Sequence, residues 1–185
     1  MDLSKISKGG QIFAGAGIVY LIASFLPWYS LPSEYEAIGI DVSYNAWGDI
    51  GFLWGSLWAL LFLGGAALLI LPAFGVQVPK LPEIAYLIVA GLATVFTVLK
   101  LLIGETEPLS SSFGIYLAVI AAAAAAFGAF TMFKESGGDL NDLKDINKIK
   151  SQFGNSGGTS MGGGTPPPPP PPGMSPPPPP PPSMG

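Results

Sequence analysis

Residues 84–103 read IAYLIVAGLATVFTVLKLLI, with Lys100 as the only charged side chain. A helix rises 1.5 Å per residue, so about 20 apolar residues cross a hydrocarbon core of ~30 Å. Three further stretches have the same character, and they run over residues 10–26, 52–71 and 113–133. Each meets or approaches the required length, so the sequence predicts four membrane-spanning helices.

One such stretch is also compatible with a buried helix of a soluble protein. Four of them leave almost no polar face for water, so we predict an all-α integral membrane protein whose four transmembrane helices form a bundle. Small residues such as Gly64, Gly65, Ala121 and Ala125 would let helix backbones approach closely. Packing within one chain is the simpler interpretation, and self-association into a homo-oligomer is the alternative.

The first stretch is the shortest, and it follows Lys5 and Lys8 as the core of a secretory signal would. Its exit is bulky, without the small residues of a cleavage site, so we interpret it as a retained anchor. Lysines alternate along the chain. They precede the first stretch, recur at Lys80 between the second and third, and follow the fourth at Lys134. The positive-inside rule then predicts a multi-pass plasma-membrane protein with both termini cytoplasmic.

Composition argues against several activities. Charged residues make up 11% of the chain, against about 25% in soluble domains. The 185 residues include no cysteine, histidine or arginine. Thiolate and imidazole metal ligands, the commonest general base and bidentate phosphate clamps are therefore missing. With a net charge of −4, the sequence predicts no enzyme, no cofactor, no metal site and no nucleic-acid partner.

Lys100 is the candidate intramembrane charge. We expect its long stem to reach the headgroups, in which case substitution is tolerated, or to make a purely structural pair. The alternative is a functional cation facing the bundle, with Glu105, Glu107 or Asp49 as its partner. The segment 27–50 adds the carboxylates of Glu34 and Glu36, and it is interpreted as a solvated acidic loop without calcium-loop spacing.

The chain divides into an N-terminal segment, 1–9, the transmembrane domain, 10–133, a juxtamembrane segment, 134–153, and a tail, 154–185. Apolar residues at every third or fourth position predict a short helix over 139–153. The tail is rich in glycine and serine and then carries two runs of seven prolines. The first run comprises Pro166, Pro167, Pro168, Pro169, Pro170, Pro171 and Pro172. The second comprises Pro176, Pro177, Pro178, Pro179, Pro180, Pro181 and Pro182.

Each proline run is expected to form a stiff polyproline II rod at the end of a disordered tail. Such rods bind aromatic-lined grooves, so the runs are the candidate sites for a cytosolic protein partner. A low-complexity spacer is the alternative interpretation. The leading functional hypothesis is a membrane-anchored interaction or scaffold protein that presents this tail. The alternative is a small transport or channel subunit that works as an oligomer.

The exit Phe25-Leu26-Pro27-Trp28-Tyr29-Ser30, the Trp47-Gly48 pair before the second stretch, and the proline-rich end are distinctive together. They resemble small four-span inner-membrane proteins of actinobacterial type with a proline-rich cytoplasmic tail. Most proteins of that type have no assigned function, so the resemblance implies a layout in the membrane and transfers no functional residue.

Overall fold

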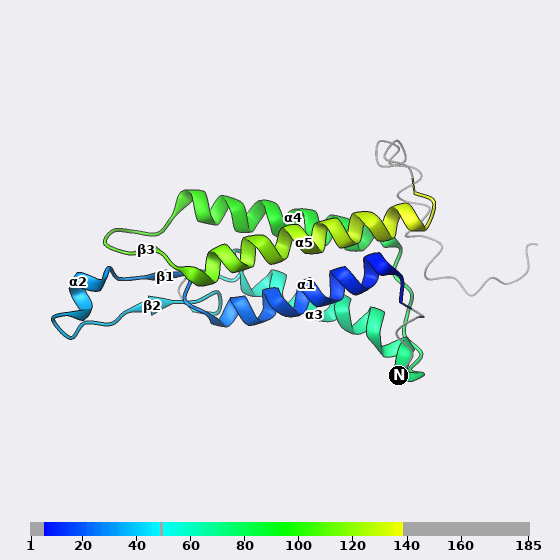
Figure 1. Cartoon of the computed structure of the whole chain (residues 1–185), viewed down its shortest axis with the longest axis horizontal. Helices are drawn as coiled ribbons and strands as arrows, with labels where there is room; N and C mark the ends of the chain where they lie inside the picture. The colour runs from blue at the N-terminus through cyan, green and yellow to red at the C-terminus, as the bar shows by residue number, and fades with distance from the viewer. Residues whose placement is uncertain (1–5, 49, 139–185) are drawn as a thin grey trace, which may run out of the picture.

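The computed structural model describes residues 6–48 and 50–138. It is mostly helical (Figure 1), with four long helices. These are α1 (Lys8–Phe25), α3 (Ser56–Ile70), α4 (Glu83–Ile103) and α5 (Phe113–Glu135). Successive helices run in opposite directions, so the two connections α1–α3 and α4–α5 meet at one end of the molecule. The predicted juxtamembrane helix, the tail and its prolines lie outside the described residues.

Three of the helical segments are long and apolar enough to cross a membrane. They are Ser56–Phe74, Glu83–Ile103 and Phe113–Glu135. This finding agrees with a multi-pass, mainly α-helical membrane protein. Helix α1 is not among the three; it has 18 residues and carries Lys8 and Gln11 in its first turn.

Helix α3 begins at Ser56, four residues later than the sequence predicted. The preceding residues turn because the connection between α1 and α3 folds onto them. A Cβ at Gly55 would collide with the Ala46 side chain and would lie 3.0 Å from the Trp28 ring. At its other end the segment passes through Pro72 as a short 3₁₀ helix, η2 (Leu71–Phe74), and ends at Gly75, whose φ of +82° favours glycine.

The sequence did not predict the small antiparallel sheet at the connection end. Its strands are β1 (Tyr29–Ser30), β2 (Ser43–Tyr44) and β3 (Ser110–Ser111), in the order β2-β1-β3. Tyr29 pairs with Tyr44 on one side and with Ser111 on the other. A one-turn helix, α2 (Ser33–Glu36), lies in the loop between β1 and β2. The sheet therefore ties the two connections together through the exit of α1.

Helices α1 and α5 form the closest pair in the bundle. A Cβ at Gly128 would lie 2.6 Å from the Phe13 backbone nitrogen and 2.9 Å from the Gly9 carbonyl oxygen. A Cβ at Gly9 would in turn collide with the Met132 backbone. Alanines at 118, 121, 122, 125 and 129 continue this buried face of α5. The close approach requires small residues on both helices, as expected where lipid supplies little hydrophobic drive between them.

The interior is filled by aromatic side chains. Phe13 and Tyr20 from α1 meet Phe62 from α3 edge to face, with ring centroids 5.6 and 5.0 Å away. Tyr86 from α4 meets Phe13 in the same way at 5.2 Å. Trp28 is fully buried and donates its indole N–H to the Ala23 carbonyl oxygen at 2.9 Å. Edge-to-face pairs add directional stabilisation to the burial of the rings.

Gly128→Ala should destabilise the bundle by about 1–3 kcal/mol, the usual cost of overpacking, because the obstructing atoms are backbone. Gly91→Ala is the matched control, since nothing lies within 4 Å of its added Cβ. It should leave stability unchanged or raise it by up to about 1 kcal/mol through helix propensity. Unfolding of both variants in mild detergent measures the difference. Equal stabilities would contradict the close approach of α1 and α5.

Candidate functional site

Lys100 lies in the last turn of α4, at the end of the bundle that carries the sheet. The helix ends at Gly104, where φ is +75°. Glycine adopts this conformation without steric cost, and the chain turns back sharply there. Glu105, the next residue, is thereby brought beside the side chain of Lys100.

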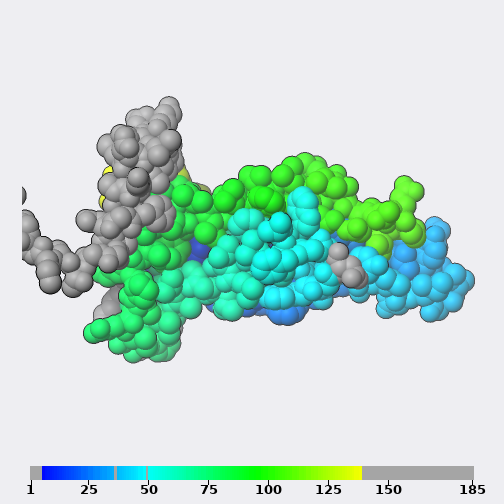
Figure 2. Space-filling model, turned by 180° about the vertical axis from the view of Figure 1, so that it is seen from behind, coloured from blue at the N-terminus to red at the C-terminus, as the bar shows by residue number. Residues whose placement is uncertain are grey.

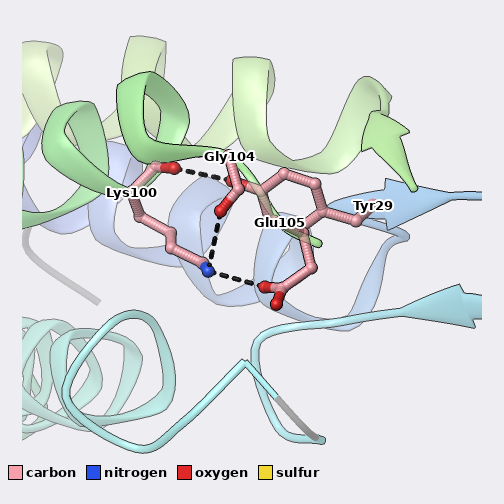
Figure 3. A network of polar contacts seen from close by, with 4 residues as sticks. All are labelled: Tyr29, Lys100, Gly104 and Glu105. Carbon is pink, nitrogen blue, oxygen red and sulfur yellow. Dashed lines mark hydrogen bonds and ion pairs between the residues drawn. The ribbon is translucent and has the colours of Figure 1, made fainter. Parts of the chain in front are cut away.

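The Lys100 ammonium group is enclosed by four partners, and Figure 3 draws three of them, Tyr29, Gly104 and Glu105. Its Nζ donates to the Gly104 carbonyl oxygen at 3.0 Å and to Glu105 Oε2 at 2.6 Å. It also lies 5.2 Å from the ring centroid of Tyr29 and 5.9 Å from that of Trp54. The side chains of Lys100 and Glu105 are 8% and 22% exposed. A charge-assisted hydrogen bond and two aromatic faces therefore take the place of water around the cation.

Tyr29 attaches this cluster to the sheet. Its hydroxyl donates to the Lys100 carbonyl oxygen at 2.7 Å, a group near the C-terminus of α4. Burial, together with the nearby Glu105 carboxylate, raises the pKa of Tyr29 to about 12. The hydroxyl therefore keeps its proton at neutral pH and remains a hydrogen-bond donor. β1 is thus held to the end of α4 by the Tyr29 side chain, and to the α4–α5 connection by its pairing with β3.

Glu105 remains ionised in this setting. The hydrogen bond from Lys100 lowers the pKa of Glu105 below the ordinary value of 4.5, against the opposing effect of partial burial. Its carboxylate is therefore the counter-ion of Lys100 at neutral pH. Because the pair joins α4 to the segment after it, the ion pair fixes the start of the α4–α5 connection.

Of the two outcomes expected together for Lys100, a stem that reaches the headgroups and a structural pair, the structure shows a pair. Lys100 is 6% exposed and faces the bundle. Of the three partners considered from sequence, Glu105 makes the ion pair. Glu107 is exposed and makes no ion pair with any described residue, and Asp49 lies outside the described residues. The Lys100 side chain is long enough either to reach the headgroups or to point into the bundle. The sequence alone therefore did not distinguish these two orientations.

Sequence reasoning missed the tyrosines that complete this polar line. Thr97, one turn below Lys100, is fully buried and lies 2.9 Å from the Tyr20 hydroxyl oxygen. Its own hydroxyl also bonds the Ala93 carbonyl oxygen at 2.7 Å. Every buried side-chain nitrogen or oxygen in residues 6–48 and 50–138 has a hydrogen-bond partner. The buried polar groups of these residues are thus satisfied, and the sequence signal for the contacts to α4 was Tyr20 within the first apolar stretch and Tyr29 just after it.

Two of the four carboxylates of the acidic loop have described side chains. Glu34 on α2 and Asp41 before β2 are exposed. In the described part of the chain, no three acidic side chains converge in a way that would hold a metal ion. Comparison with family models, with curated proteins and with solved structures finds no match to this chain. The resemblance to four-span actinobacterial proteins stays a prediction.

The ion pair can be tested with single and double substitutions. Glu105→Gln should cost about 3–5 kcal/mol, because it leaves a buried ammonium group without its counter-ion. Lys100→Gln should cost less, about 1.5–3 kcal/mol, because the Glu105 carboxylate retains contact with water. The double variant should be more stable than the sum of the two losses predicts.

Thermal or denaturant unfolding in mild detergent measures all three variants. Glu107→Gln is the matched control, since this exposed carboxylate makes no ion pair with a described residue, and it should change stability by less than about 0.5 kcal/mol. Additive losses in the double variant would show that Lys100 and Glu105 do not act as a pair.

Proposed function

We propose that this protein is a plasma-membrane anchor of four transmembrane helices, with both termini cytoplasmic, that presents its proline-rich tail to a cytosolic protein. In this proposal the bundle supplies location and orientation, and the tail supplies recognition. The alternative hypothesis from the sequence is a transport or channel subunit, which would require a polar passage through the bundle or through an oligomer.

The filled interior of the bundle carries the proposal. Phe13 and Tyr20 of α1 and Phe62 of α3 are fully buried, and their rings pack edge to face between the helices. Among these rings, Tyr20 makes a polar contact, a hydrogen bond between its hydroxyl and that of Thr97. Such packing suits an anchor, because a conduit would place polar groups along a hydrated path.

The surface of α1 supports the proposal that this helix spans the membrane in addition to the three candidate spans. One face of α1 packs on α3 and α5, and its outward face presents Ile18, Val19, Ile22 and Phe25, each at least 40% exposed. Several neighbouring apolar side chains facing outward along a helix suit lipid rather than water. The helix also runs antiparallel to α3, as a span preceding it would.

The distribution of charge supports the orientation. Lys8, Lys80 and Lys134 lie at the end of the bundle where α1 and α4 begin and α5 ends. Glu34 and Glu107 belong to the connections at the opposite end. The positive-inside rule assigns the lysine-bearing end to the cytoplasm. The chain beyond α5, which leads to the prolines, would then begin on the cytoplasmic side.

Single cysteines test the orientation, because the native chain contains no thiol. Ser33 and Ser110 are exposed at the sheet end, and Gln77 is exposed in the α3–α4 connection. An impermeant maleimide should label Ser33→Cys and Ser110→Cys in intact cells, and Gln77→Cys only after permeabilisation. The reverse pattern would contradict the proposed orientation, and uniform labelling would contradict insertion across the membrane.

Removal of residues 154–185 tests the tail. Truncation should leave membrane insertion and thermal stability unchanged, because proline runs lack backbone donors and add nothing to helix packing. Recovery of cytosolic partners after cross-linking should be lost. Deleting one run should weaken binding, by up to roughly 100-fold if both runs engage together.

A tail of equal length, with the prolines replaced by glycine and serine, is the control for spacing. It should behave like the truncated protein, since it lacks the preset polyproline conformation. If this control keeps every partner, the tail acts only as a spacer. Function would then have to be sought in the bundle.

A further inference from the structure

A cleft opens between α3 and α4 at the lysine-bearing end of the bundle. Near the sheet these helices are bridged by aromatic contacts, with Phe96 of α4 lying 5.2 Å from the Trp58 ring centroid and 5.9 Å from that of Trp54. Toward the opposite end they diverge, and Figure 2 shows a hollow there between the cyan atoms of α3 and the green atoms of α4. The cleft has a volume of about 870 Å³, within the ~300–1,000 Å³ typical of ligand sites.

The floor of the cleft is apolar. Leu68 and Leu69 from α3, Tyr86 from α4 and Met132 from α5 contribute to it. Tyr86 and Met132 are each only 6% exposed, and the two leucines are half-buried. Such a floor favours a hydrocarbon chain over water, by about 0.8 kcal/mol for each buried methylene group.

The rim of the cleft carries charges of both signs. Lys80 from the α3–α4 connection, Glu83 from the first turn of α4, and Glu135 from the last turn of α5 all line it. Lys80 and Glu83 make no ion pair with any residue in 6–48 or 50–138. Glu135 accepts one long hydrogen bond, 3.4 Å, from the Gly9 backbone nitrogen. The rim thus offers one cation and two carboxylates at the ends of membrane-length helices.

We propose that this cleft binds a phospholipid with a zwitterionic, primary-ammonium headgroup of the phosphatidylethanolamine type. One acyl chain lies along the apolar floor. The phosphate pairs with Lys80, and the ammonium group donates to Glu83 and Glu135. The ends of transmembrane helices lie at headgroup depth, where pockets between helices bind headgroups by charge.

The charges of the rim determine the lipid class. An anionic phosphatidylglycerol headgroup has no ammonium to offset the two carboxylates. A phosphatidylcholine headgroup carries a positive charge but no N–H donor for them. The inference goes beyond the proposed function and is independent of it, since an anchor requires no bound lipid.

Native mass spectrometry of the full chain tests the proposal. The protein, purified in mild detergent, is mixed with equal amounts of phosphatidylethanolamine, phosphatidylcholine and phosphatidylglycerol of the same acyl composition. Phosphatidylethanolamine should be the main bound lipid, at one molecule per chain. Lys80→Gln should reduce its binding roughly two- to fivefold, the effect of one partly exposed ion pair. Glu83→Gln combined with Glu135→Gln should abolish the preference over phosphatidylglycerol.

Leu69→Trp fills the floor of the cleft and should remove most of the bound lipid. Leu61→Trp is the matched control, because Leu61 lies on the same helix and is 39% exposed. It should keep both the bound lipid and its headgroup preference. Thermal unfolding should show that Leu69→Trp remains folded, and the Lys80 and glutamate variants test the headgroup separately.

Three results would overturn the proposal. The bound lipids could match the composition of the mixture, Leu69→Trp could retain lipid as Leu61→Trp does, or binding could appear only after residues 139–185 are removed. The last result would identify the chain's own C-terminal segment as the occupant of the cleft. If the truncated protein shows the same headgroup preference as the full chain, the result supports the lipid site. The proposed role of the tail is then tested separately by the truncation experiment described above.

Discussion

The close approach of α1 and α5 is the contact on which the remaining structure depends. At Gly9 and Gly128 the backbones meet without an intervening side chain. The pair presents two lateral faces, and α3 packs on the α1 side while α4 packs on the α5 side. Near the sheet, Phe96 of α4 packs on Trp58 of α3 and on Trp54 just before that helix. The cleft lies between the two helices toward the other end.

The end of the bundle near the sheet is held by interactions of a different kind. The strand β1 lies between β2 and β3, Tyr29 bonds the end of α4, and Lys100 bonds the segment after α4. Polar contacts at this end are buried under the connections, which is why the cation is enclosed rather than hydrated. The opposite end has no comparable cluster among the described residues, and its charges line an open cleft. The bundle is therefore asymmetric, with one end cross-linked and the other accessible.

The features of the fold that depend on local composition, above all the positions of the long apolar helices, could be predicted from the sequence. Long apolar stretches gave the positions of α4 and α5 to within a few residues, because their length and lack of charge are local properties. The late start of α3 was missed, since it depends on Ala46 and Trp28 packing against Gly55 from a distant segment. The sheet was missed for the same reason, because its two-residue strands carry no periodicity. The orientation of Lys100 depends on Gly104 and Tyr29 together, which no local pattern relates.

The partnership of the first and last helices also constrains how the molecule is made. Gly9 and Glu135, which meet through a hydrogen bond from the Gly9 backbone nitrogen to the Glu135 carboxylate, are 126 positions apart in the chain. Because synthesis proceeds from the N-terminus, α1 is made long before its main partner, α5. During that interval α3 is the one long helix of the described residues already made that packs on α1. The closest helix pair of the bundle can therefore form only after α5 has been made.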